Sequence, residues 1–174
     1  MNRYAIDPAR VYVAGLSAGG AMAAILGHAY PDLYAAVGVH SGLASGAAKD
    51  LSSGLAAMRR GAAVSSEEPR LPTIVFHGDA DDTVHPDNAT HVVAATVGPV
   101  DASAQIDRQE AAEGRGYTRT VHRSPQREVL AEEWIVHGSG HAWSGGSGEG
   151  SFTDPEGPDA TKEMLRFFAE HARE

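Results

Sequence analysis

The sequence contains no cysteine among its 174 residues, which excludes disulfides, thiol catalysis and cysteine-based zinc sites. It also lacks any apolar run near the roughly 20 residues that a membrane-spanning helix needs, so no membrane partner is expected. Positive charge is scarce, because 14 Lys and Arg stand against 23 Asp and Glu for a net charge of −9. Nucleic-acid binding requires clustered positive charge and is therefore not expected.

The residues that are present are those of one ordinary globular domain over positions 1–174, with 42% hydrophobic residues. Short apolar runs of β-forming residues predict strands, and the segments between them predict helices. The expected strands are 11–14, 35–40, 73–77, 117–122 and 129–137, of which the last two form a hairpin. The expected helices are 21–30, 55–60, 86–97 and 158–172, whereas 102–116 and 138–157 are expected to be irregular. Strands that alternate with helices indicate an α/β fold with a largely parallel sheet flanked by helices.

The strongest chemical signal is the segment Gly15-Leu16-Ser17-Ala18-Gly19, which has the pattern G-x-S-x-G. In a nucleophile elbow of this pattern, the serine lies on a strained turn between a strand and a helix, with its hydroxyl exposed. An apolar strand is expected directly before Ser17 and a small-residue helix directly after it, as the elbow requires. We therefore predict that Ser17 is a nucleophile and that the backbone amide of Ala18 is one donor of an oxyanion hole.

Three carboxylates follow the expected strand 73–77, and one of them is the candidate acid of a catalytic triad. Asp81 lies three residues after Gly78 and three before Val84, which matches the H-G-x-x-D-x-x-V loop of many serine hydrolases. Asp79 and Asp82 are more typical of turns or helix caps. Asp81 is therefore predicted to orient the catalytic histidine.

The candidate general base is His141, in the glycine-rich segment that follows the last expected strand. The chain order Ser17, Asp81, His141 is the order found in hydrolases with this type of elbow. Trp143, two residues after His141, and His40, at the end of an expected strand, are predicted to contact substrate. For Trp143 a role in packing the loop is an equal alternative, and for His40 a supporting hydrogen bond is the alternative.

Five segments together resemble the poly(3-hydroxybutyrate) depolymerase-type esterases, which are related to feruloyl and acetylxylan esterases. These segments are 7–22, 34–42, 76–86, 140–146 and 153–160, and they extend over most of the chain. The resemblance implies an α/β-hydrolase fold and a triad of Ser17, Asp81 and His141. No cofactor or metal is expected.

Relatives of this kind place about four strands before the elbow, whereas only sixteen residues precede Ser17 here. We therefore expect the C-terminal portion of an α/β-hydrolase fold, in which the second oxyanion donor is not supplied by this sequence. An exposed edge of the sheet would favour a homodimer. The first seven residues lack the apolar core of a signal peptide. The esterases that the chain resembles are often secreted, so the sequence assigns no cellular compartment.

Two alternative functions are compatible with the sequence. A metal-dependent hydrolase could use the dense group of His77, Asp79, Asp81 and His85. A hydrolase-fold module without catalytic activity is the other alternative, because a fold does not fix a function. For the esterase, the resemblance implies short-chain hydroxyalkanoate, simple acyl, or feruloyl and acetyl esters as substrates, without a choice among them.

Overall fold

The computed structural model describes residues 5–64, 71–98, 102–110 and 113–173. Its central element is a six-stranded sheet with the order β1-β2-β3-β6-β5-β4. The strands of this sheet are β1 (Tyr12–Leu16), β2 (Ala36–His40), β3 (Thr73–Gly78), β4 (Ser103–Gln109), β5 (Tyr117–Arg123) and β6 (Val129–Val136). The helices are α1 (Ala18–Ala29), α2 (Leu51–Arg60), α3 (Asp87–Val97) and α4 (Ala160–Glu170). Two short strands, β7 (Trp143–Ser144) and β8 (Thr153–Asp154), pair with each other.

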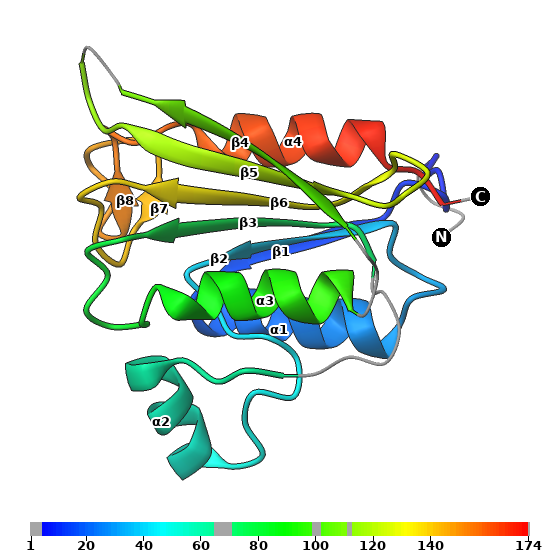
Figure 1. Cartoon of the computed structure of the whole chain (residues 1–174), viewed down its shortest axis with the longest axis horizontal. Coiled ribbons are helices and arrows are strands. Elements are labelled where there is room, and N and C mark those ends of the chain that lie inside the picture. Colours follow the sequence, from blue (N-terminus) through cyan, green and yellow to red (C-terminus); the bar gives the residue numbers. More distant parts are fainter. Residues whose placement is uncertain (1–4, 65–70, 99–101, 111–112, 174) are drawn as a thin grey trace.

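The molecule has three layers, with the sheet in the middle (Figure 1). Helices α1 and α3 cover one face of the sheet, and α4 covers the other. Strands β1, β2, β3 and β6 are parallel, and β5 and β4 continue the sheet in antiparallel pairing. The expected α/β fold with a mostly parallel sheet is therefore confirmed.

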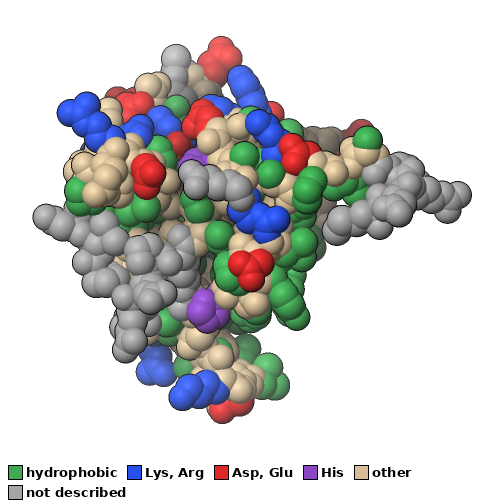
Figure 2. Space-filling model, turned by 90° about the vertical axis from the view of Figure 1, so that its right-hand side faces the viewer, with side chains coloured by type: hydrophobic (Ala, Val, Ile, Leu, Met, Phe, Trp, Pro, Cys, Tyr) green, Lys and Arg blue, Asp and Glu red, His purple; other side chains and the backbone are tan. Residues whose placement is uncertain are grey.

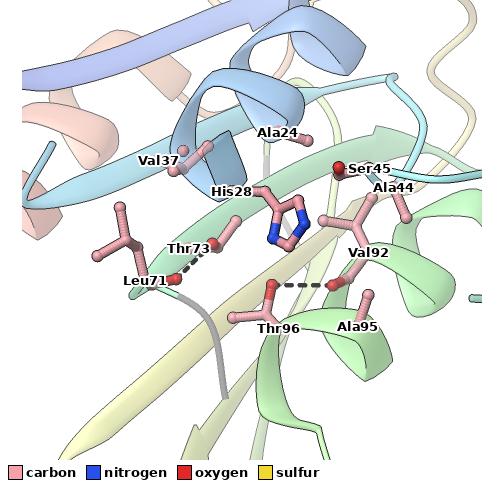
Figure 3. A pocket seen from close by; sticks show the side chains of 11 residues that line it. Ala24, His28, Val37, Ala44, Ser45, Leu71, Thr73, Val92, Ala95 and Thr96 are labelled. Carbon is pink, nitrogen blue, oxygen red and sulfur yellow. Dashed lines mark hydrogen bonds between the residues drawn. The ribbon is translucent and has the colours of Figure 1, made fainter. Parts of the chain in front are cut away.

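The central strands β2 and β3 are buried at every position, which explains why they read as continuous apolar runs rather than alternating ones. On the α1 side, small residues allow close packing. A Cβ on Gly27 of α1 would lie 2.4 Å from Cγ2 of Val37, so a larger residue would push the helix off the sheet. Between α1 and α3 a cavity of about 20 Å³ remains beside His28, which is room for about one water molecule (Figure 3).

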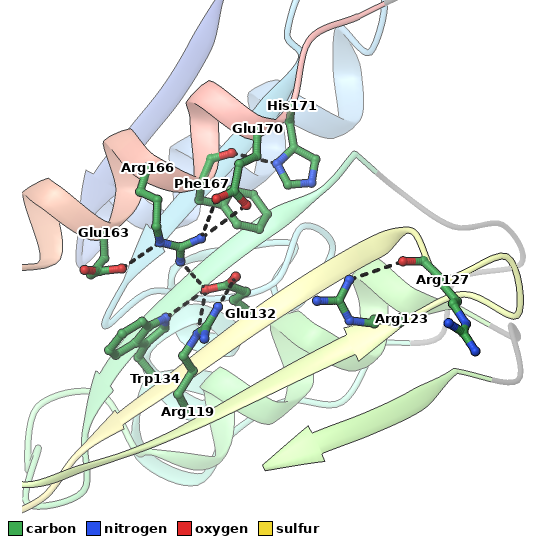
Figure 4. Close-up of polar contacts among 10 residues, drawn as sticks. All are labelled: Arg119, Arg123, Arg127, Glu132, Trp134, Glu163, Arg166, Phe167, Glu170 and His171. Atoms are coloured by element: carbon green, nitrogen blue, oxygen red, sulfur yellow. Dashed lines mark hydrogen bonds and ion pairs between the residues drawn. The ribbon is translucent and has the colours of Figure 1, made fainter. Parts of the chain in front are cut away.

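On the opposite face, α4 is fixed to the sheet by a buried carboxylate, Glu132 of β6 (Figure 4). Its oxygens accept hydrogen bonds from Arg119 of β5 at 2.6 Å, from Arg166 of α4 at 2.6 Å and from the indole of Trp134 at 3.2 Å. Burial raises the pKa of Glu132, but the hydrogen bonds from the two arginines outweigh it and lower the pKa. Removal of both arginines would leave a buried, uncompensated charge, so this group of residues holds β5, β6 and α4 together.

Three expectations about local structure are wrong. The segment 102–116 was expected to be irregular, yet 103–109 forms β4 and pairs with β5 over seven residues. All seven residues of β4 are exposed, so backbone pairing with β5 stabilises the strand and its sequence shows no apolar pattern. Helix α2 begins at Leu51 rather than at 55, because Asp50 and Ser53 form a capping box. The loop 138–157 contains β7 and β8.

Strand β1 lies at one edge of the sheet and, among the described strands, pairs with β2 alone. Dimer formation through this edge stays a prediction. Viewed from the side of the two chain ends, the described surface shows basic and acidic side chains interspersed rather than gathered by sign (Figure 2). Among the described residues, no helix is long and apolar enough to cross a membrane.

Candidate active site

Ser17 connects β1 to α1 in a backbone conformation that is rare for any residue other than glycine. Its φ is 58° and its ψ is −121°, and such conformations cost free energy and concentrate at functional sites. Its backbone N–H donates to the carbonyl of His40 at 2.8 Å, which ties the turn to the end of the neighbouring strand. Ala18 is the first residue of α1, so its N–H has no carbonyl partner within the helix and lies at the positive end of the helix dipole.

The two glycines of the G-x-S-x-G segment differ in what surrounds them, and this difference gives a matched pair of variants. A Cβ on Gly15 would lie 2.3 Å from the carbonyl carbon of Gly19, whereas a Cβ on Gly19 would meet nothing within 4 Å. We expect Gly15→Ala to displace the turn at Ser17 and to destabilise the fold by about 2–4 kcal/mol. We expect Gly19→Ala to change stability by less than about 1 kcal/mol.

Urea unfolding of both variants beside the unsubstituted chain checks this expectation. Equal losses of stability for the two variants would contradict a steric requirement at Gly15 alone.

Asp81 lies in the loop between β3 and α3, and its carboxylate is fully buried. One oxygen, Oδ1, accepts the backbone N–H groups of Thr83 at 2.9 Å and Val84 at 2.8 Å. The other, Oδ2, lies 2.8 Å from Nδ1 of His141 and 3.4 Å from Nε2 of His77. Burial raises the pKa of Asp81, but the hydrogen bonds to its carboxylate outweigh burial and hold this pKa well below the ordinary value. The group is therefore a carboxylate at neutral pH.

The other two carboxylates of the same loop make different contacts. Asp79 lies 2.9 Å from Nδ1 of His137 and accepts the backbone N–H of Gly138 at 2.6 Å. Asp82 is exposed, and the hydroxyl of Thr83 lies 3.4 Å from its carboxylate. Of the three candidates, the one that contacts His141 is thus Asp81.

His141 follows β6 in a loop that polar contacts hold in place from two sides. Ser139 donates its hydroxyl to Asp154 of β8 at 2.6 Å, and Asp154 also forms an ion pair with Arg115. On the other side, the backbone N–H of Ser144 donates to Nε2 of His40 at 2.9 Å. These contacts fix the loop on both sides of His141, whose own Nδ1 contacts Asp81. Sequence reasoning missed Ser139, Arg115 and Asp154, because polar loop residues far apart in the chain carry no signal of their contact.

His40 connects the turn of Ser17 to the loop of His141. Its backbone carbonyl accepts from Ser17, and its ring stacks on Trp143 and Phe76 with centroid distances of 5.1 and 5.7 Å. Since Ser144 donates to Nε2, the proton of the neutral ring lies on Nδ1, 3.2 Å from the hydroxyl of Ser41. Burial, with smaller contributions from the neighbouring His77 and His141, lowers the pKa of His40 to about 3. The residue is 1% exposed, so this geometry favours the supporting role over direct contact with substrate.

The neutral state of His40 predicts a pH dependence of stability. The folded protein keeps this ring unprotonated down to about pH 3, whereas the unfolded chain protonates it near pH 6.5. Between these values the unfolded state binds one more proton, so stability rises with pH and is lost as the pH falls from 6.5. The expected contribution is about 1.4 kcal/mol for each pH unit within this window.

Urea unfolding between pH 6.5 and 4.5 measures this slope, and His40→Gln serves as the comparison. The amide oxygen of Gln can accept the N–H of Ser144 without titrating. In this variant the free energy of unfolding should therefore depend less steeply on pH, by about 1.4 kcal/mol for each pH unit. If stability has the same pH dependence in His40→Gln and in the unsubstituted chain, His40 is protonated in the folded protein at these pH values.

The remaining predicted residues lie as follows. Trp143 is half-buried, packs against the core beneath α4 and donates its indole N–H to Thr161 at 3.1 Å. A cavity of about 330 Å³ opens beside Ser17 between α1 and α2, and its described lining includes neither Trp143 nor His40. Direct contact of these two residues with substrate stays a prediction. The cavity itself was not foreseen from the sequence.

The four residues of the metal alternative do not gather into one ligand set. Asp79 pairs with His137, and His85 lies 3.6 Å from Asp87 on the surface. Among the described residues, no group of three or more His, Cys, Asp or Glu side chains is placed to hold a metal ion. Of the four, only the pair His77 and Asp81 lies within 4 Å in the described chain.

Comparison with known proteins identifies the family. The family model described as esterase PHB depolymerase matches residues 1–115, which include Ser17 and Asp81. The chain belongs to the PHB depolymerase esterase family. A poly(3-hydroxybutyrate) depolymerase of Ralstonia pickettii is 30% identical over an alignment of 166 residues, which covers 84% of this chain and 32% of that protein. A poly(3-hydroxyalkanoate) depolymerase C of Paucimonas lemoignei is 27% identical over an alignment of 154 residues, which covers 79% of this chain and 36% of that protein.

The fold of this family member is also that of solved esterases. An acetyl xylan esterase from Aspergillus awamori superposes with a TM-score of 0.66 at 18% identity, covering 97% of this chain and 62% of its own. A PHB depolymerase complexed with an R3HB trimer superposes with a TM-score of 0.60 at 18% identity, covering 94% and 52%. At such identities the likeness supports the fold alone. The chain spans about a third of the length of the curated relatives it matches.

Proposed function

We propose that this member of the PHB depolymerase esterase family hydrolyses carboxylic esters through an acyl-enzyme on Ser17. The observation that carries the proposal is the 2.8 Å contact between Asp81 and Nδ1 of His141, two side chains sixty residues apart in sequence. They meet at the carboxyl ends of β3 and β6, on the same edge of the sheet where β1 ends at Ser17. A buried carboxylate on Nδ1 leaves Nε2 unprotonated, which is the state that a general base needs.

In the proposed reaction, Nε2 of His141 takes the proton of the Ser17 hydroxyl as its oxygen attacks the ester carbonyl. The N–H of Ala18 donates to the oxygen that gains negative charge. His141 then protonates the leaving alcohol, and a water molecule activated in the same way releases the acid and restores Ser17. Asp81 keeps the imidazole in the required tautomer and stabilises its protonated form. In the described chain no hydrogen bond joins Ser17 to His141, and such bonds often tighten only when substrate is bound.

For the substrate, we propose short-chain hydroxyalkanoate, simple acyl, or feruloyl and acetyl esters. Two kinds of support exist for this range. The relatives include depolymerases of poly(3-hydroxybutyrate) and poly(3-hydroxyalkanoate), and the similar structures include an acetyl xylan esterase and a depolymerase with an R3HB trimer. The cavity beside Ser17 is lined mainly by apolar side chains, which suits an uncharged ester.

A serine-directed phosphonate tests the proposal. The folded chain is incubated with a p-nitrophenyl alkylphosphonate, and the expected result is release of one nitrophenolate per chain with the phosphonyl group on the peptide that contains Ser17. EDTA should have no effect. Activity that EDTA abolishes, with no label on Ser17, would overturn the proposal in favour of a metal-dependent hydrolase. A folded sample that shows neither labelling nor activity would favour a module without catalysis.

A further inference from the structure

An apolar groove begins at Ser17 and runs between α1 and α2, with a volume of about 330 Å³. Each helix contributes one stripe of side chains to it. The α1 stripe is Ala18, Ala21, Met22 and Ile25, and the α2 stripe is Leu51, Gly54, Leu55 and Met58. Both stripes have the spacing i, i+3, i+4, i+7, which places their members on a single face of the helix. The two helices therefore present matching apolar faces to the same space.

The groove leaves large apolar side chains partly in solvent. Met22 is 53% exposed, Ile25 44% and Leu55 45%, so burial by a partner molecule would remove apolar surface from water. Contiguous apolar surface of this kind, in a concave site with few polar groups, is typical of a ligand-binding groove. The capping box of Asp50 and Ser53 fixes where helix α2 begins. The helix is tied to the loop before α3 by the carbonyl of Met58, which accepts the N–H of His85 at 2.7 Å.

The position of the groove relative to the reacting groups indicates which half of an ester would lie in it. His141 must reach the leaving alcohol to protonate it, so the alcohol half lies beside His141. The described lining of the groove does not include His141, and it begins at Ser17 and Ala18, where the carbonyl carbon and its oxygen would be held. The groove therefore lies on the acyl side of the ester. From Ala18 to Ile25 it follows α1 for roughly 10 Å, the rise of seven helical residues.

We propose that the groove between α1 and α2 is the acyl-binding site, and that it selects unbranched aliphatic acyl chains of hexanoyl to octanoyl length over acetyl. Met22, Ile25, Leu51 and Leu55 are the residues that determine this selectivity. The inference rests on the proposed function, because the groove is an acyl site only if Ser17 attacks the carbonyl carbon that carries the acyl chain.

The test compares p-nitrophenyl acetate, butyrate, hexanoate and octanoate as substrates of the full chain. We expect kcat/KM to rise about fourfold for each added methylene up to hexanoate, the factor that burial of one methylene gives. Leu55→Asp and Met22→Asp, one for each wall, should lower kcat/KM for hexanoate at least tenfold and for acetate less than twofold. Leu165→Asp, at an exposed leucine of α4 on the other face of the sheet, is the matched control and should leave both values unchanged.

The outcomes separate this inference from the proposed function. Hydrolysis that depends on Ser17 but has the same chain-length profile in Leu55→Asp would overturn the acyl groove and leave the esterase standing. Hydrolysis that survives Ser17→Ala would overturn the proposed acyl-enzyme on Ser17, whatever its chain-length profile. A measurement that needs no catalysis is NMR titration with N-methylhexanamide and N-methylacetamide. The expected result is that the hexanoyl compound alone shifts the amides of α1 and α2, and equal or distant shifts would count against the groove.

Discussion

Hydrolysis of p-nitrophenyl butyrate is expected to disappear in Ser17→Ala, with kcat/KM lower by on the order of 10⁴-fold or more. The reason is that the proposed acyl-enzyme forms on the hydroxyl oxygen of Ser17, and no other group of the site replaces it. The backbone should keep its shape, because alanine has the same Cβ as serine at the turn. The Ser17 hydroxyl makes no hydrogen bond that the substitution would break among the described residues. Stability is therefore expected to change by less than about 0.5 kcal/mol.

Thermal unfolding of Ser17→Ala separates lost chemistry from lost structure. Ser103→Ala, at the exposed start of β4, is the matched control and should keep full activity. If Ser17→Ala hydrolysed the ester as fast as the unsubstituted chain, the nucleophile would have to be another residue.

The buried strands of the sheet and two residues of the candidate triad could be proposed from the sequence because they lie in local patterns. Strands β2 and β3 are buried on both faces and therefore contain continuous apolar runs, of which Ile74, Val75 and Phe76 are an example. Ser17 and Asp81 lie in short motifs in which glycines and turn residues have fixed places. The contact between Asp81 and His141 was inferred from the chain order of the two residues, and the structure places them 2.8 Å apart.

Other features could not be predicted, because they depend on which distant segments meet. Strand β4 has exposed side chains throughout and is defined by its pairing with β5. The same limit applies to His40. Its type and position suggested contact with substrate, but the bond from Ser144 and the stacking of Trp143 follow from loops a hundred residues later in the chain. The groove beside Ser17 depends on the position of α2 against α1, which no local pattern in the sequence specifies.

Asp81→Asn is expected to lower kcat by about 10⁴-fold, although the side chain keeps its size. The amide oxygen of Asn can still accept the N–H groups of Thr83 and Val84, which hold Oδ1 in the present structure. The amide nitrogen, however, would take the place of Oδ2 beside His141 and can only donate. It would draw the imidazole into the tautomer with its proton on Nε2, and that nitrogen could no longer accept the proton of Ser17.

The neighbouring variant Asp82→Asn is the matched control for Asp81→Asn, because the same chemical change is made one residue away at an exposed side chain that does not reach His141. It should retain activity within about twofold, as expected of a surface substitution away from the site. NMR of ¹⁵N-labelled histidine distinguishes the proposed cause from a general loss of structure. The Asp81→Asn variant should show His141 with its proton on Nε2 in a chain that is otherwise folded. Loss of activity with the proton still on Nδ1 would mean that Asp81 acts through its negative charge rather than by choosing the tautomer.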